Sequence, residues 1–332
     1  MNFEEQMMRT ALVTAVAGAV VAFLLGLLTF GVQATVHPHD VPLAVVAPPP
    51  VAEKVRAADS AEVDIRVVSA DEARNLLRDK EVYGVLEIAP GQATIRLNPA
   101  VNPSGTQVAQ QVLTGVAQGA GLPVRIDAQT PTAAERTAPL AASALLWVGG
   151  MIAGLLFVVL KGKKLRWLSA LTTAVLVTGS TTGLLAWWGV TFTAEALAFM
   201  LAVAVSFALL QAGLFKHLGI RAMGVLGLLY LMAPAVAGQV PELLDPAYRA
   251  VLWSWTPFRF SAEGLRSLMY NGSVSTEWWV FGGIAVAGLA LLVMNKAELA
   301  GEKAQTDRAD GVVDVGVDEA DGLPRAERQH TA

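Results

Sequence analysis

The sequence predicts an α-helical, polytopic membrane protein with six transmembrane helices and a small α/β extracytoplasmic domain between the first and the second. Three observations carry this prediction. Of the 332 residues, 54% are hydrophobic and only 16% are charged, whereas about 25% of residues are charged in an average soluble domain. The apolar residues form blocks of roughly 20, the helix length that crosses about 30 Å of hydrocarbon. The tryptophans lie at the block ends, where an indole ring can sit among lipid headgroups.

The blocks and the tryptophans can be located directly in the sequence. Six stretches are long enough or nearly long enough to span a bilayer: about 10–32, 141–160, 167–188, 196–215, 222–240 and 278–295. All eight tryptophans lie at the ends of these blocks or in the segment before the last one: Trp147, Trp167, Trp187, Trp188, Trp253, Trp255, Trp278 and Trp279. This distribution favours a bilayer over the core of a soluble protein.

These blocks divide the chain into six parts. We expect an N-terminal stretch with the first transmembrane helix, the extracytoplasmic domain, transmembrane helices two to five, an outer amphipathic or re-entrant segment, the sixth transmembrane helix and a disordered acidic cytoplasmic tail. Their respective bounds are 1–36, 37–140, 141–240, 241–277, 278–296 and 297–332.

Basic residues in the short loops predict the orientation. Cytoplasmic loops carry an excess of Lys and Arg. Two loops meet this rule, through Lys161, Lys163, Lys164 and Arg166 in one and Lys216 and Arg221 in the other. With six spans, both termini are then cytoplasmic and residues 37–140 lie outside a plasma membrane. Three arginines in the segment placed outside count against this topology: Arg249, Arg259 and Arg266.

The first apolar block has two interpretations. Small residues around Ala34 would suit cleavage of a secretory signal. The block extends from Ala11 to Val32, however, and the apolar core of a signal is only about 7–15 residues long. We expect an uncleaved membrane anchor.

The extracytoplasmic domain has alternating strand and helix patterns. Strands are expected at 63–67, 82–88, 93–97 and 124–126, with helices starting after the capping sequence Ser69 to Glu72 and covering about 105–119. The three prolines at 48–50 predict an extended linker. Because no catalytic grouping occurs in this domain, we expect a binding or structural module and not an enzyme.

Composition argues against several other classes. The chain has no cysteine, and its net charge of −4 comes without a basic patch, so we expect no disulfide, no cofactor and no nucleic-acid partner. His37, His39 and Asp40 are the only grouping that resembles metal ligands. With no third histidine nearby, they are better interpreted as a solvated loop, and we expect no metal site.

Small and hydroxylated residues mark the transmembrane blocks. Gly150 and Gly154, and likewise Gly179 and Gly183, are spaced so that neighbouring helices can approach closely. The third block is the most polar, through Thr178, Ser180, Thr181 and Thr182. These hydroxyls either pack between helices or line a substrate path.

The segment 241–277 combines three prolines with apolar faces, which predicts short helices in or re-entering the outer leaflet. Glu263 and Arg266 are three apart on one such helix and are expected to pair with each other there. Together with the four hydroxyl residues of the third block, they are the candidate residues of a substrate path. Ionisable residues are otherwise scarce in the apolar blocks, which argues against a proton- or ion-coupled transporter.

The whole layout resembles the permease subunits of ABC-2-type ABC transporters, in particular the members related to the phage infection protein. The resemblance is carried by the strand-helix-strand run Val63 to Pro90 and by the outer segment from Pro241-Glu-Leu-Leu-Asp-Pro through Trp255-Thr-Pro-Phe to Glu263-Gly-Leu-Arg266. The resemblance implies one span, an extracytoplasmic domain and five further spans, with re-entrant helices before the last.

The resemblance also implies an exporter that forms a homodimer, or pairs with a similar permease, in the lipid bilayer. The span layout, the outer segment and the lack of buried carboxylates favour a hydrophobic or lipid-like substrate. ATP would be hydrolysed by a separate ATPase subunit, and no Gly-x-x-x-x-Gly-Lys-Ser/Thr occurs here. That ATPase would contact Met1 to Arg9 and the basic link Lys161 to Trp167, although the link also serves as an orientation signal. The alternative is a non-transporting scaffold or receptor that acts through its extracytoplasmic domain.

Overall fold

The computed structural model describes residues 3–57, 61–127, 131–270, 272 and 274–294. The chain divides into two units, Met1–Leu292 and Val293–Ala332. The tail 297–332, expected to be disordered, lies outside the described residues.

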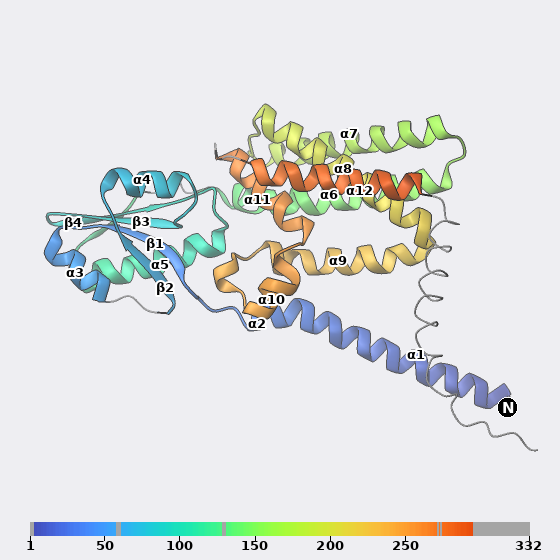
Figure 1. Cartoon of the computed structure of the whole chain (residues 1–332), viewed down its shortest axis with the longest axis horizontal. Helices are drawn as coiled ribbons and strands as arrows, with labels where there is room; N and C mark the ends of the chain where they lie inside the picture. Colours follow the sequence, from blue (N-terminus) through green and yellow to red (C-terminus); the bar gives the residue numbers. More distant parts are fainter. Residues whose placement is uncertain (1–2, 58–60, 128–130, 271, 273, 295–332) are drawn as a thin grey trace, which may run out of the picture. The chain divides into compact units, whose positions relative to one another are not determined.

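The α/β domain is built on a mixed five-stranded sheet with the order β2-β1-β3-β4-β5. Its strands are β1 (Val41–Val46), β2 (Val63–Val67), β3 (Gly84–Ala89), β4 (Gln92–Leu97) and β5 (Val124–Ile126). Among the described strands, only the β3–β4 pair is antiparallel. Helix α4 (Ala70–Arg78) packs on one face, whereas α3 (Pro49–Ala57) and α5 (Pro103–Gly119) pack on the other (Figure 1).

The strands and helices expected at 63–67, 93–97, 105–119 and 124–126 are confirmed to within two residues. The prediction of an extended proline linker was wrong, because α3 begins at Pro49. Proline is well tolerated in the first helical turn, where its missing N–H has no partner anyway. Strand β1 was not predicted, because this central strand is largely buried on both faces and lacks polar alternation.

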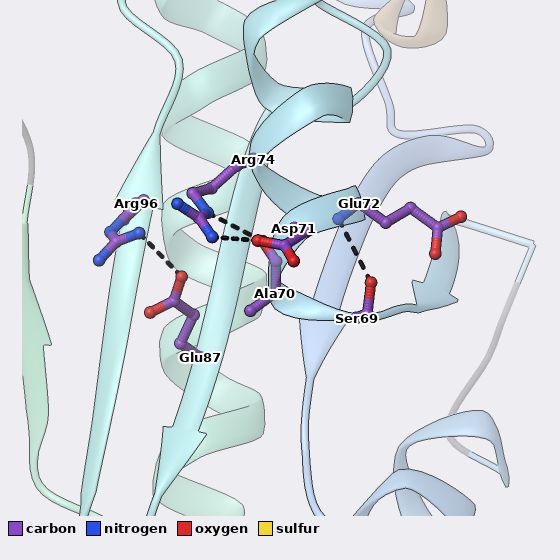
Figure 2. A network of polar contacts seen from close by, with 7 residues as sticks. All are labelled: Ser69, Ala70, Asp71, Glu72, Arg74, Glu87 and Arg96. Carbon is purple, nitrogen blue, oxygen red and sulfur yellow. Dashed lines mark hydrogen bonds and ion pairs between the residues drawn. The ribbon is translucent and has the colours of Figure 1, made fainter.

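Charged side chains lie on the α4 side of the sheet (Figure 2). Arg96 of β4 donates to Glu87 of β3 at 2.8 Å, and Asp71 pairs with Arg74 on α4. At the start of α4, the backbone N–H of Glu72 donates to the Ser69 hydroxyl at 3.3 Å, while the Glu72 carboxylate points away from it. The expected capping sequence therefore caps α4 through the Ser69 hydroxyl, and the Glu72 side chain does not complete a capping box.

The remaining described elements are helical. They are α1 (Phe3–Gly26), η1 (Leu27–Gly31), α2 (Val32–Ala34), α6 (Ala133–Val159), α7 (Lys163–Trp187), α8 (Ala194–Leu218), η2 (Gly219–Arg221), α9 (Ala222–Ala237), η3 (Pro241–Leu243), α10 (Pro246–Tyr248), η4 (Arg249–Trp253), α11 (Pro257–Met269) and α12 (Ser275–Val293). Helices α6, α7 and α8 pack against one another, and α12 lies against α8 (Figure 1).

By length and composition, five stretches among the described residues are able to cross a membrane. They are Glu5–Ala34, Ala133–Val159, Lys163–Trp187, Ala194–Ala237 and Ser275–Val293. The fourth stretch contains both the fourth and the fifth expected span. It is interrupted at Gly219, whose φ of +60° suits glycine, and α9 after this break has 16 residues. Such a helix is about 24 Å long.

Helix α1 has almost no packing neighbours among the described residues. Its residues 11–24 are exposed along their whole length. In the described part of the chain, packing against other elements is found where η1 and α2 contact α9, and there the Tyr248 hydroxyl donates to the Leu27 carbonyl at 2.9 Å. A long apolar helix without packing partners needs lipid or another apolar surface around it.

Trp147 does not lie at a headgroup level, which corrects the belt interpretation for this residue. It is fully buried and lies well inside α6, which starts at Ala133 and not near residue 141. Its ring packs against Phe207 and Phe258, and its Nε1–H donates to the Leu226 carbonyl at 3.3 Å. In contrast, Trp187 is 87% exposed at the end of α7.

Candidate functional site at the junction of the α/β domain and the helices

The α/β domain is attached to the helices through the chain that follows α9. The backbone N–H groups of His37 and His39 donate to the carbonyls of Leu243 and Glu242, at 3.2 and 2.8 Å. The Leu243 side chain is buried in the core of the α/β domain. Backbone pairing and apolar burial therefore fix the domain to η3, and the two histidines have a backbone role there.

Polar side chains reinforce this attachment. The Asn102 side-chain oxygen accepts a hydrogen bond from the backbone N–H of Ser104 at 3.1 Å and so caps α5. The Nδ2 of the same side chain donates to the Ala237 carbonyl, at the end of α9, at 3.0 Å. Tyr83 donates its hydroxyl hydrogen to the Glu242 carboxylate. Burial first, and the neighbouring Glu242 second, raise the pKa of Tyr83, so this phenol is a permanent donor.

Helix α11 carries a charged cluster toward the junction. The Arg259 guanidinium lies 3.3 Å from the Glu263 carboxylate and 3.7 Å from the centre of the Trp253 ring. Burial raises the pKa of Glu263 to about 7, although Arg259 and Arg266 act in the opposite direction. Lys80 of the α/β domain also reaches α11.

The expected pairing of Glu263 with Arg266 is replaced by the pairing with Arg259, which lies one turn earlier at the i,i+4 spacing. Arg266 is only 4% exposed, and its Nη1 has no hydrogen-bond partner among the described residues. Burial lowers the pKa of Arg266 to about 10. Arg266 is therefore a buried cation near neutral pH without an ion-pair partner in the described part of the chain.

Arg266 lines a pocket of about 450 Å³ between the α/β domain and the helices. One wall is formed by the end of β4, the loop after it and α5, and the other by the start of α6 and the end of α11. The volume lies within the range of about 300–1,000 Å³ that small-molecule sites occupy.

The hydroxyl residues of the third span lie elsewhere, on α7. Thr178 and Thr181 are buried, Thr182 is half-buried and Ser180 is exposed. Ser180 donates to the Val177 carbonyl within its own helix at 3.1 Å. Helix α7 packs against α6 and α8, whereas α11 packs against α6, α8 and α9. The structure thus places the two halves of the expected substrate path on different helices.

The two glycine pairs differ in their surroundings. A Cβ on Gly154 would lie 2.8 Å from the backbone nitrogen of Ala212, and one on Gly150 would lie 3.0 Å from the Phe207 Cβ, so α6 and α8 are in close contact there. A Cβ on Gly179 or Gly183 would meet nothing within 4 Å. The second pair therefore has no packing partner within the described chain.

The basic link connects α6 to α7. Lys161, Lys163 and Lys164 are exposed. Arg166 is different, because its Nε donates to the Leu160 carbonyl at 2.7 Å and satisfies the end of α6. Three of the four expected ATPase-contact residues are therefore available on the surface.

Sequence reasoning missed several residues of the junction. The spacing of four residues between Arg259 and Glu263 also predicts an ion pair on a helix, but the prediction above paired Glu263 with Arg266, three residues away. Asn102, Arg136 and Tyr270 carry no local signal, because their neighbours at the junction come from distant parts of the chain.

Comparison with known proteins gives a partial match. A stretch of 71 residues is 41% identical to the Inner membrane-spanning protein YciB of Paracidovorax citrulli, and the match covers 20% of this chain and 35% of that protein. No family model matches the chain, and no solved structure matches it. The matched protein is named as membrane-spanning, which agrees with the five stretches of this chain that are long and apolar enough to cross a membrane. The chain is a multi-pass membrane protein.

Proposed function

We propose that the chain is the permease subunit of an ABC-2-type exporter, which moves a hydrophobic or lipid-like substrate with a separate ATPase subunit. The observation that carries the proposal is the order of parts: an unpacked apolar helix, an α/β domain, packed apolar helices and the amphipathic α11 before α12. In this proposal the protein crosses the plasma membrane six times as a homodimer or beside a similar permease.

The packing at one end of the helices supports this topology. Phe157 near the end of α6, Ala170 near the start of α7 and Ala212 near the end of α8 form one cluster, against which Leu292 of α12 packs. The two basic loops therefore lie at the same end, as the positive-inside rule requires for the cytoplasmic side. The α/β domain contacts α9 at its other terminus, at Ala237.

The same contacts support a fifth crossing. Lys216 at the end of α8 donates to the Leu292 carbonyl at 2.7 Å, so α8 and α12 end on one side. Because α12 has to start on the opposite side, the chain must cross once between these helices, and α9 is the helix available. The proposed count is therefore six, with both termini cytoplasmic.

Two of the three outer arginines that count against this topology are either engaged in contacts or buried. Arg259 is engaged with Glu263 and the Trp253 ring, and Arg266 is buried. Both are held in folded structure between α9 and α12, whereas the orientation rule concerns basic residues of short loops.

The exposed lysines are the proposed ATPase contact. Lys163 and Lys164 occupy the first turn of α7, where positive charge opposes the helix dipole at a cost of about 0.3–1 kcal/mol each. Their position therefore does not stabilise α7, which fits a role in orientation or in contact with a partner.

Affinity purification from native membranes tests this proposal. We expect an ATPase polypeptide to co-purify with the wild-type chain and its yield to fall about tenfold on joint substitution of Lys161, Lys163 and Lys164 by Gln. A matched variant, Arg74→Gln with Arg78→Gln on the exposed face of α4, should retain the ATPase. A wild-type chain that always purifies without an ATPase contradicts the proposal.

One observation favours the scaffold or receptor alternative. The α/β domain has its own apolar core and presents paired charges on one face (Figure 2). In that case Arg74→Glu and Arg96→Glu should abolish the scaffold or receptor activity of the α/β domain, while Glu263→Gln and the lysine substitutions should leave this activity intact. The opposite pattern supports the exporter.

A further inference from the structure

The pocket between the α/β domain and the helices combines a buried cation with an apolar wall. Arg266 is 96% buried, and its Nη1 lacks a partner among the described residues. A buried charge without a hydrogen-bonded counter-ion is costly, commonly by several kcal/mol, and persists where something else compensates it. The same pocket contains a second unsatisfied donor group, the Tyr270 hydroxyl.

The other charges of the pocket do not neutralise Arg266. Glu135 lines the pocket, but its carboxylate accepts the Thr132 backbone N–H at 2.7 Å, within the capping box that starts α6. Arg136 lines the pocket as well and is exposed. Glu263, on the same helix, attracts Arg266, but it forms its ion pair with Arg259 and does not line the pocket. The pocket lining therefore has two arginines and one glutamate that is already engaged in a helix cap, which leaves the pocket positive.

The rest of the lining is apolar or uncharged. Leu97, Val101 and Ile126 form an apolar wall, and Gln107 and Gln110 of α5 supply neutral amides. Ile126 is 44% exposed. A ligand that satisfies both parts carries an anion at one end and an apolar group at the other.

We infer that this pocket binds a small amphiphile with one anionic group, a carboxylate or a phosphate, whose charge meets Arg266 and whose apolar part lies on Leu97 and Ile126. The planar guanidinium donates two parallel hydrogen bonds to either anion. The Tyr270 hydroxyl supplies a further donor. This assignment does not depend on the exporter proposal, because binding requires no ATPase.

Calorimetric titration of the full-length chain in phosphatidylcholine nanodiscs tests the inference, with empty nanodiscs as the blank. The probes are octyl phosphate, octanoate, inorganic phosphate and octan-1-ol. Saturable binding of octyl phosphate and octanoate, at least tenfold tighter than that of the other two, is expected. If inorganic phosphate binds as tightly as octyl phosphate, the ligand needs no apolar part and the inference is wrong. If octan-1-ol binds as tightly, the ligand needs no anionic group and the inference is also wrong. If neither octyl phosphate nor octanoate binds, the pocket is not a binding site for such ligands.

Variants locate the binding. Arg266→Gln should weaken octyl phosphate at least tenfold and should leave the ligand-free melting temperature unchanged or higher, because it removes a buried unpaired charge. Arg96→Gln, which removes an ion-paired arginine on the sheet, should bind like the wild type. Gln107→Trp on the exposed side of α5 should also block the pocket and serves where Arg266→Gln fails to fold. Wild-type affinity in both pocket variants contradicts the inference.

Discussion

Glu263 of α11 shows how burial and ion pairing oppose each other at a single carboxyl group. Burial raises its pKa to about 7, and Arg259 at 3.3 Å does not fully reverse this. Because the folded pKa is above the ordinary value of about 4.3, the fold favours the protonated form. The stabilising contribution is complete below about pH 4.3 and is lost as the pH rises through about 7.

This pH dependence can be measured by melting purified protein at pH 5 and pH 8. The wild type should be less stable at pH 8 by about 2–4 °C, a modest shift because the Glu263 side chain remains 31% exposed. Glu263→Gln should remove most of this difference, whereas Asp71→Asn on the exposed face of α4 should keep it. An identical pH difference in wild type and Glu263→Gln would show that the burial of Glu263 is not the cause.

Trp147 is a core residue and not a membrane anchor, so its replacement should be costly. Removal of a fully buried tryptophan side chain costs about 3–5 kcal/mol. Trp147→Ala should therefore reduce the yield of monodisperse protein and lower its melting temperature strongly, whereas Trp187→Ala, at an 87% exposed position, should change the melting temperature little. Size-exclusion chromatography with thermal unfolding measures both, and equal losses would contradict the burial of Trp147.

At the scale of elements, close backbone contact holds α6 against α8 at Gly154, and α12 meets α8 in the same way at Gly288. Gly154→Ala places a methyl group against α8 backbone and should cost about 1–3 kcal/mol. Gly179→Ala has open space and should be neutral or stabilise α7 by up to about 1 kcal/mol, since alanine favours helix. The melting temperature should fall for Gly154→Ala and should stay the same or rise for Gly179→Ala. Destabilisation by both, in equal measure, would show that Gly179 also packs against a neighbour.

Local patterns in the sequence identified most elements, because apolar blocks and two-residue alternation depend only on nearby residues. These local patterns did not predict elements whose structure depends on packing against distant residues. Strand β1 is buried on both faces and Pro49 starts a helix, so neither shows its usual pattern. The site was less predictable than the fold. Glu263 and Arg266 were found on the correct helix, but their partners depend on packing that spacing alone does not specify.

For the whole molecule, the proposed topology requires that the α/β domain and the basic loops lie on opposite sides of the bilayer. The end of α9 at Ala237 contacts the domain through Asn102, whereas the ends of α6, α8 and α12 meet near the basic loops. The excess of Lys and Arg in the short loops then indicates which side is cytoplasmic. The exporter proposal, with its cytoplasmic ATPase, depends on this arrangement.

The native chain has no cysteine, so single cysteines report this arrangement without background. The most direct test compares Asp71→Cys on α4 with Lys163→Cys in the basic link, both exposed, by labelling with a membrane-impermeant maleimide. We expect Asp71→Cys to react in intact cells and Lys163→Cys to react only after permeabilisation. Labelling of Lys163→Cys in intact cells, with Asp71→Cys protected, would contradict the account.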